Sequence, residues 1–254
     1  MKKTICLLIL SLVIAEAQAV TTSIVAQWDD FSNLNRTWEG KDVNITLNGN
    51  DSAPVINENK HLVFNGQSGS FANITFPQGF TPGWTADKTY GIQLTISGLQ
   101  LSDNLHQLFT YNGATPSGVA ANNSGLITSG SNMNSWGNVF GTGQLSDTFT
   151  LTVLQSYTSG TRYYINGQYV EVDTSGWKTS NKTWTSLDLG NTYKDNTGAE
   201  FILENLALFS VDSTNIENLN AAATEMYGRL VPESSTASLA LLGLAALMFH
   251  RRKA

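Results

Sequence analysis

Residues 162–170 read Arg162-Tyr163-Tyr164-Ile165-Asn166-Gly167-Gln168-Tyr169-Val170. The Asn-Gly pair supplies the two positive φ angles of a type I′ turn, and residues with high strand propensity flank it on both sides. This stretch therefore predicts a tight antiparallel hairpin. Because the rest of the chain also alternates apolar and polar residues in short segments, the hairpin favours an all-β fold.

Three segments outside the hairpin alternate apolar and polar residues with a period of two. They cover residues 43–48, 90–97 and 148–153. In each segment we expect a strand with one face in the core and the other in water. Residues 24–28 indicate a further strand near the start, although Val25 interrupts its alternation. Glycine, asparagine and serine are frequent between these segments, which is typical of a sandwich.

One helix is expected after the last strand. Thr214-Asn215-Ile216-Glu217 matches a capping box, in which Thr214 would cap the first turn. Apolar residues follow near helical spacing at Ile216, Leu219, Ala222, Ala223 and Met226. Gly228 is expected to close the helix, so the sequence predicts helical structure over residues 214–227.

The order of these elements resembles the end of LamG-like (concanavalin A-like) domains. The shared features over residues 161–228 are the Asn-Gly hairpin, the segment Leu187-Asp188-Leu189-Gly190, the apolar strand from Phe201 to Phe209 and the short capped helix. Residues 20–160 fit this family only in strand spacing, and its glycine in the late strand is not evident. The resemblance implies an antiparallel jelly-roll sandwich of two sheets over residues 20–230, with one short C-terminal helix.

The first 19 residues are predicted to be a secretory signal peptide. Lys2 and Lys3 precede an apolar stretch, and Ala17-Gln18-Ala19 matches an A-x-A cleavage site. The alternative is an N-terminal anchor helix, for which the apolar stretch is short. The only cysteine of the chain, Cys6, lies inside this segment, so we expect the processed protein to fold without a disulfide.

Residues 231–254 resemble the PEP-CTERM sorting signal of Gram-negative bacteria. The segment contains Val231-Pro232-Glu233, an apolar run from Leu239 to Phe249, and the basic residues Arg251, Arg252 and Lys253. Ser234 stands where the family has a second proline. The resemblance implies a transmembrane sorting helix, recognition by an exosortase-like membrane peptidase, and delivery to the cell surface or extracellular matrix. The alternative is an ordinary amphipathic helix, but the apolar run has no polar face.

The region between these two ends is acidic. Residues 20–230 contain nine Lys and Arg residues and eighteen Asp and Glu residues, which gives a net charge of −9. This charge argues against nucleic acid and anionic membrane surfaces as partners. Charged residues make up only 13% of the whole chain, where about 25% is usual. Asparagine, threonine and serine provide much of the polarity instead, as in many extracellular β-rich proteins.

No catalytic pattern is evident in the sequence. Glucanases of the concanavalin A-like fold use E-x-D-x-x-E on one strand, and the nearest match, Glu171-Val172-Asp173, lacks the third acid. The chain has no G-x-S-x-G motif, and only His61 and His106 lie between residues 20 and 230. We therefore expect a protein that is not an enzyme. A glycosidase with an unrecognised active site is the alternative.

Tryptophans in polar connections are the candidate ligand-binding residues. Exposed aromatic rings stack on sugar rings, and neighbouring amides bind hydroxyl groups. The candidates are Trp136, Asn138, Trp177 and Trp184. The other interpretation is that these rings plug the end of the sandwich. The corresponding function is binding of a polysaccharide or a matrix component, and the alternative is a structural component of the envelope or exopolysaccharide layer.

A calcium site is a second candidate. LamG-like domains often hold Ca²⁺ in a loop, and one connection here is rich in the oxygen donors that this ion prefers. Its candidate ligands are Asn191, Asp195, Asn196 and Glu200. A solvated loop without a metal explains the same residues, because their spacing matches no strict motif.

The two ends lead to a first prediction. A protein spanning residues 20–230 should be soluble, monomeric and β-rich by circular dichroism, because the strand 201–209 and the helix after it already close the sandwich. The apolar run beyond Pro232 has no face left to cover. In its host, this shortened protein should be misplaced instead of attached to the surface. Insolubility of the shortened protein, or a mature surface protein that still ends at Ala254 by mass spectrometry, would contradict the prediction.

Overall fold

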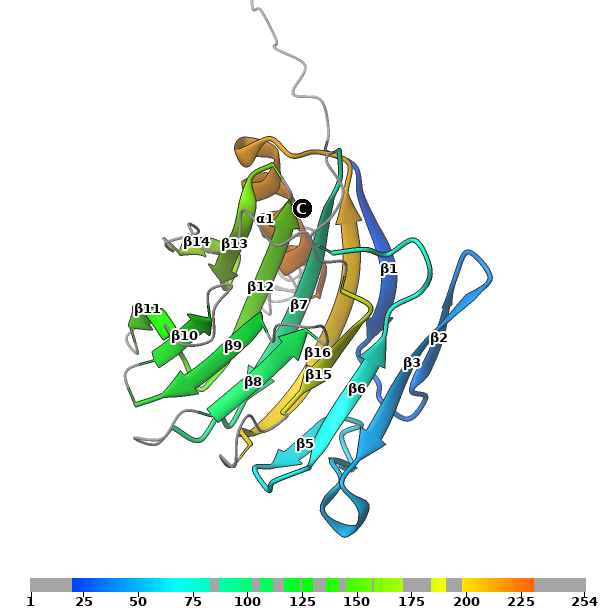
Figure 1. Ribbon diagram of the computed structural model, residues 1–254, viewed down its shortest axis with the longest axis vertical. Coiled ribbons are helices and arrows are strands. Elements are labelled where there is room, and N and C mark those ends of the chain that lie inside the picture. Colours follow the sequence, from blue (N-terminus) through cyan, green and yellow to red (C-terminus); the bar gives the residue numbers. More distant parts are fainter. Residues whose placement is uncertain are drawn as a thin grey trace, which may run out of the picture.

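The computed structural model describes residues 20–82, 87–101, 106–111, 117–123, 125–129, 136–141, 145–156, 158–170, 184–190 and 198–230. These residues form two antiparallel sheets and one helix, α1 (Ile216–Leu230). The sheets lie face to face, with α1 on the outside of one of them (Figure 1). The expectation of an all-β sandwich with a short helix after its last strand is confirmed.

The first sheet contains the central strands of the domain. In the described part of the chain it has eight strands, and β16 pairs with β7 along one edge and with β5 and then β1 along the other. In spatial order the strands are β14 (Gln168–Val170), β13 (Gly160–Ile165), β12 (Thr148–Ser156), β7 (Thr89–Ser97), β16 (Glu200–Val211), β5 (Leu62–Asn65) and β4 (Val55–Ile56), with β1 (Thr22–Trp28) beside β16.

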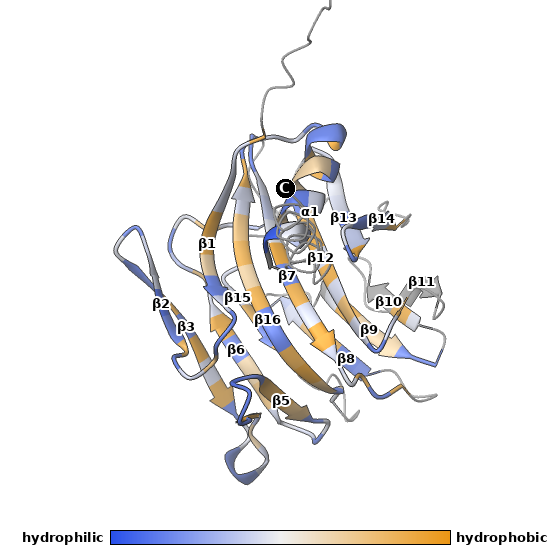
Figure 2. Cartoon of the chain, turned by 180° about the vertical axis from the view of Figure 1, so that it is seen from behind, coloured by the Kyte–Doolittle hydropathy of each residue, from blue (hydrophilic) through white to orange (hydrophobic). Residues whose placement is uncertain are grey.

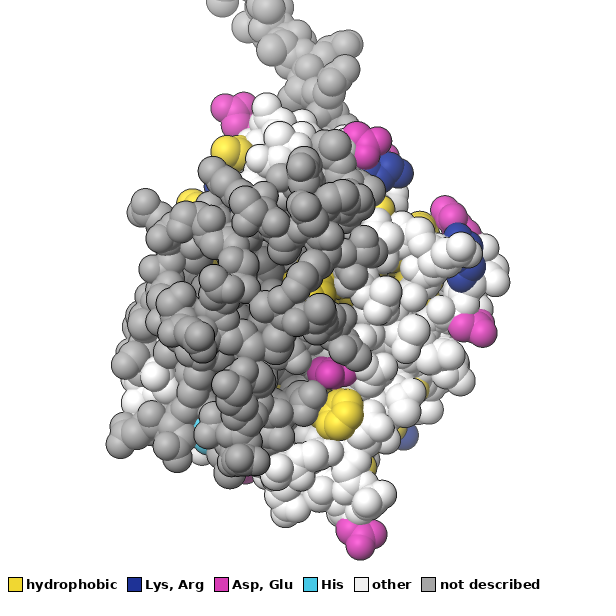
Figure 3. Space-filling model, viewed as in Figure 1, with side chains coloured by type: hydrophobic (Ala, Val, Ile, Leu, Met, Phe, Trp, Pro, Cys, Tyr) yellow, Lys and Arg dark blue, Asp and Glu magenta, His cyan; other side chains and the backbone are white. Residues whose placement is uncertain are grey.

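The second sheet also has eight strands in the described residues. In spatial order they are β11 (Trp136–Gly141), β10 (Gly125–Ser129), β9 (Ser117–Asn122), β8 (His106–Tyr111), β15 (Ser186–Leu189), β6 (Phe71–Thr75), β3 (Lys41–Asn48) and β2 (Asn35–Trp38). The 3-10 turn η1 (Asn50–Ser52) lies between β3 and β4. Figure 3 shows that the face over β2, β3 and β6 has few charged side chains.

The main core lies between the two sheets. It contains Ile92, Leu94 and Phe201 from the first sheet and Ile74 and Leu187 from the second, all almost completely buried. Hydrophobic residues concentrate along β1, β16 and β7, and hydrophilic residues lie in turns such as the one between β2 and β3 (Figure 2). The pleat of a strand explains this arrangement, because alternate side chains point to opposite faces.

A second apolar cluster lies on the other face of the first sheet, under α1. Leu154 and Phe209 from the sheet meet Leu219 and Met226 from the helix. Both faces of the first sheet are therefore dry where α1 covers it. This corrects the expectation of one wet face for residues 90–97 and 148–153. Their buried polar side chains bond to one another, since an unpaired buried polar group is costly.

Specific hydrogen bonds replace water for these polar residues. Gln93 Nε2 donates to the carbonyl oxygen of Met226 at 3.3 Å, and Thr152 Oγ1 donates to Gln93 Oε1 at 3.0 Å. The hydroxyl oxygens of Thr95 and Thr150 lie 3.2 Å apart across the neighbouring strands. Gln93 therefore ties α1 to β7 and β7 to β12.

The predicted hairpin is confirmed, whereas the predicted helix cap is displaced by one residue. Asn166 and Gly167 have φ values of 50° and 74° and join β13 to β14 as a two-residue turn. The helix begins at Ile216, and Asn215 Oδ1 accepts a hydrogen bond from the amide of Glu217 at 2.8 Å. Asn215 thus caps the helix instead of Thr214.

Two further details of the expected elements differ in the structure. The helix continues to Leu230, so Gly228 lies inside its last turn and does not end it. In β1, the pairing register shifts between Ile24 and Ala26, which makes Val25 an extra residue in a β-bulge. The bulge explains why Val25 breaks the alternation and yet is buried, with 4% exposure.

Aromatic rings fill one part of the main core. The rings of Tyr111 and Trp184 are stacked with their centroids 5.4 Å apart, and Phe76 and Phe109 pack edge-on against Tyr111. In the described residues, neither the Tyr111 hydroxyl nor the Trp184 indole N–H has a hydrogen-bond partner. Burial, with a smaller contribution from Tyr163, raises the pKa of Tyr111 well above its usual value.

A second prediction concerns the stability of this core. Tyr111→Phe should increase the free energy of unfolding by about 1 kcal/mol, because it removes a buried hydroxyl that has no partner. The unfolded chain ionises Tyr111 above a pH of about 10, whereas the folded chain keeps it neutral. The wild-type protein should therefore lose stability as the pH rises past that value, and the variant should lose less. Urea unfolding at pH 7 and at alkaline pH measures both effects.

Tyr164→Phe is the matched control. The Tyr164 hydroxyl donates to Asn220 Oδ1 at 2.8 Å, so the same chemical change removes a satisfied hydrogen bond there. This variant should lose about 1 kcal/mol of unfolding free energy. A loss of stability in both variants would show that the Tyr111 hydroxyl is bonded in solution.

Candidate functional site

A groove lies at one end of the sandwich, where four strands of the first sheet begin or end. Ser97 ends β7 and pairs with Thr148 of β12 and with Ile202 of β16, while Asn65 ends β5 and pairs with Glu200. The segments that extend beyond these strand ends are residues 98–101 and 145–147. Together they form what we call the end groove.

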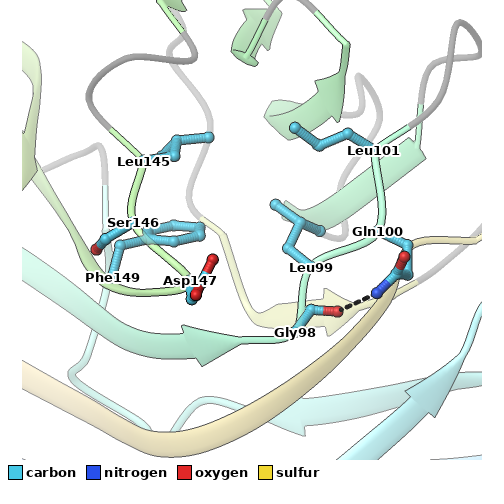
Figure 4. A pocket seen from close by; sticks show the side chains of 8 residues that line it. All are labelled: Gly98, Leu99, Gln100, Leu101, Leu145, Ser146, Asp147 and Phe149. Carbon is cyan, nitrogen blue, oxygen red and sulfur yellow. Dashed lines mark hydrogen bonds between the residues drawn. The ribbon is translucent and has the colours of Figure 1, made fainter.

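The first half of the end groove has apolar walls. Leu145 and Leu101 point toward each other from opposite sides, with Leu99 and Phe149 below them (Figure 4). The cavity between them measures about 280 Å³, and its lining also includes Asp147. Leu99, Leu101 and Leu145 are half-buried and pack on the main core, so these walls are continuous with the interior of the domain.

The second half of the end groove, which we call the polar half, is lined mostly by glycines and polar side chains. It has a volume of about 350 Å³ and shares Gln100 and Leu101 with the first half. Its other lining residues are Asn65, Gly66, His106, Gly198 and Glu200. Because the two halves share lining residues, a ligand longer than one sugar ring could contact both halves.

Backbone hydrogen bonds hold the groove in shape. The amide of Gly98 donates to the carbonyl oxygen of Asp147 at 3.2 Å, and the amide of Gln100 donates to that of Glu200 at 3.0 Å. His106 Nδ1 donates to the carbonyl oxygen of Gly198 at 3.1 Å. A Cβ atom on Gly198 would lie 2.5 Å from the carbonyl oxygen of Gly190, so only glycine fits there.

Three further side chains of the end groove donate hydrogen bonds within the protein. Asn65 Nδ2 donates to the carbonyl oxygen of Ser52 at 3.0 Å, and Gln100 Nε2 donates to that of Gly98 at 3.2 Å. The hydroxyl of Ser146 donates to the carbonyl oxygen of Thr148. In the described structure, the carboxylates of Asp147 and Glu200 make no hydrogen bond or ion pair, and both residues are exposed. The groove therefore offers hydrogen-bond acceptors.

The structure corrects the expectation that Trp184 is exposed in a connection. Its ring is 1% exposed and stacks on Tyr111, because the residue lies two positions before β15, a strand inside the second sheet. It cannot act as an exposed platform for a sugar. Trp136 and Asn138 lie on β11, and Trp177 lies outside the described residues.

Of the four candidate calcium ligands, the structure describes one. Glu200 begins β16 and lines the end groove, whereas Asn191, Asp195 and Asn196 lie outside the described residues. Within the described ranges, no group of three or more His, Cys, Asp or Glu side chains could hold a metal ion. A calcium site in this connection therefore stays a prediction.

The proposed signal and sorting segments lie outside the described residues. These include the cleavage site at Ala17 and Ala19 and the sorting motif at Val231, Pro232 and Glu233. Among the residues that are described, no helix is both long enough and apolar enough to cross a membrane.

The residues that line the first half of the end groove were not predicted from the sequence. Leu99 and Leu101 follow an alternating strand, and Leu145 precedes another, so the sequence pattern alone marks them as strand flanks. Leu101 and Leu145 are far apart in the chain, and only the pairing of β7 with β12 brings their segments together. No local signal could have identified this groove.

Comparison with solved structures supports the sandwich fold. A structure of botulinum neurotoxin type C, whose cell entry depends upon interaction with two ganglioside molecules, matches with a TM-score of 0.55 and 13% identity over 84% of this chain and 52% of that chain. The ligand-binding domain of botulinum neurotoxin serotype D in complex with N-acetylneuraminic acid matches with a TM-score of 0.51 and 13% identity, over 81% and 50% of the two chains.

A sialidase also shares the fold. Trypanosoma rangeli sialidase in complex with a difluorosialic acid matches with a TM-score of 0.51 and 15% identity, over 82% of this chain and 33% of that chain. This chain thus spans about half the length of the toxin chains and a third of the sialidase chain. Neither a protein-family model nor a curated protein sequence matches it. At these identities, the likeness establishes the fold alone.

Proposed function

We propose that this protein binds glycans through the end groove and does not catalyse a reaction. The observation that supports this most directly is the combination of leucine walls with two exposed carboxylates that have no partner among the described residues. Binding sites for small ligands are mostly apolar, with a few polar groups that fix orientation. Solved proteins of similar fold bind gangliosides and N-acetylneuraminic acid, which is consistent with a sugar ligand here.

The geometry of the end groove suits a sugar ring. One face of a pyranose exposes C–H groups, which can lie against Leu101 and Leu145, and its edge exposes hydroxyl groups. A carboxylate accepts hydrogen bonds from two neighbouring hydroxyls, and bonds to a charged acceptor are stronger than neutral ones. Asp147 lies in the apolar half and Glu200 in the polar half, so a ligand of two or more rings could reach both.

The proposal includes an extracellular location. Residues 1–19 would direct export, and residues 231–254 would direct the protein to the cell surface after processing by an exosortase-like peptidase. The low charge of the surface over β2, β3 and β6 suits a domain surrounded by polysaccharide (Figure 3). The ligand would be a polysaccharide or a matrix glycan.

Binding to immobilised glycans tests the function. We expect the protein spanning residues 20–230 to bind at least one polysaccharide on a glycan array, with and without EDTA. Leu101→Asn and Leu145→Asn should each weaken that binding about tenfold, because each removes apolar contact with the ring. Calorimetric titration with the strongest oligosaccharide provides the affinities.

The control is Ile216→Asn. Ile216 is 48% exposed and begins α1, at the opposite end of the first sheet from Glu200. This variant also replaces an aliphatic residue by asparagine, but it should bind as the wild type does. If no glycan binds, or if the groove variants bind as tightly as the control, the end groove is not a glycan site. Circular dichroism confirms that each variant is folded.

A further inference from the structure

The hydrogen-bonding groups and charges of the end groove restrict the class of glycan. This step rests on the proposed function, since it concerns the ligand of the same groove. Asn65, Gln100 and Ser146 each donate a hydrogen bond to a backbone carbonyl oxygen, whereas the carboxylates of Asp147 and Glu200 have no partner among the described residues. These two carboxylates favour a ligand that donates hydrogen bonds.

The charge of the groove also disfavours an anionic ligand. Of the residues described as lining it, two are acidic and none is Lys or Arg. Residues 20–230 as a whole have a net charge of −9. Among the described lining residues, a sugar carboxylate would meet two like charges and no Lys or Arg.

We infer that the end groove selects uncharged, hydroxyl-rich glycans and rejects sialylated ones. N-acetylneuraminic acid, which the serotype D toxin domain binds, carries a carboxylate that accepts hydrogen bonds and cannot donate them when ionised. Placing it beside Asp147 would leave both acceptors unpaired and bring two negative charges together. Like charges placed together at an interface are a strong source of specificity. This chain therefore shares a fold with sialic acid-binding proteins but differs in the ligand that it accepts.

Asp147 is the residue on which this selection depends most. Its carboxylate points into the cavity between Leu99, Phe149 and Leu145 (Figure 4). The apolar neighbours reduce access of water to this carboxylate when a ring covers them, which strengthens both the attraction of a hydroxyl and the repulsion of an anion. Glu200, at the start of β16, extends the same effect to the polar half.

An array of matched pairs tests the inference, with each neutral oligosaccharide placed beside its sialylated form. We expect the neutral member to bind about tenfold more tightly than its partner, and high salt to narrow the difference, because salt screens repulsion. Asp147→Asn removes the charge but keeps the size of the side chain. It should weaken binding of the neutral member about tenfold and reduce the discrimination between the pair.

Asp212→Asn is the charge-matched control. Asp212 follows the last residue of β16 and lies 3.5 Å from Lys88, at the far end of the sheet from the groove. This variant changes the net charge by the same amount as Asp147→Asn. It should leave the affinities for the neutral and the sialylated oligosaccharide unchanged. Equal or tighter binding of the sialylated members would overturn the inference but not the proposed function, and so would unchanged affinity in Asp147→Asn. Binding to neither member of any pair would overturn both.

Discussion

The fold depends on the burial of the first sheet on both of its faces. The second sheet covers one face through residues such as Ile92 and Leu94, and α1 covers the other through Phe209 and Leu154. Because Gln93 lies between these layers, its amide must bond to protein groups instead of water. A slip of β7 by one residue would place Gln93 in the apolar core, so burial and hydrogen bonding together fix the register of the sheet.

α1 does not extend over one end of the first sheet, and the end groove forms at that end. The residues that α1 contacts lie in the later halves of β12 and β16, toward Val211. At the other end, the connections beyond β7 and before β12 continue past the sheet and bond to each other through Gly98 and Asp147. The groove is thus anchored to rigid strand ends, while its carboxylates are not needed by the core. A site of this kind combines fixed geometry with free hydrogen-bonding groups.

The sequence predicted the local features well because they depend on near neighbours. Asn166-Gly167 has only a few conformations available, and the alternation around Val43 and Ile45 maps directly onto a pleated strand. Burial by distant elements was not predictable in the same way. The alternation of β7 looks like that of a strand with one wet face, and only the position of α1 shows that Gln93 is buried.

The candidate site was harder to predict for the same reason. Trp184 lies in a polar stretch of sequence, which indicated an exposed ring. In the structure the ring is buried and stacks on Tyr111 of the neighbouring strand β8. Leu101 and Leu145 come from two separate connections and Glu200 from the start of β16, and their proximity follows from strand pairing alone. Only Glu200 was singled out from the sequence, as a candidate calcium ligand.

The position of β16 has a further consequence for how the chain folds. β16 lies inside the first sheet and is also the last strand that the structure describes. Its partners β1, β5 and β7 all end before Gly98, more than one hundred residues earlier. Closing such long loops costs conformational entropy, so folding is slow, as in other proteins with high contact order. During synthesis from the N-terminus, β1, β5 and β7 are made before β16, the strand that joins β1 and β5 to β7. The first sheet therefore stays incomplete until β16 has been synthesised.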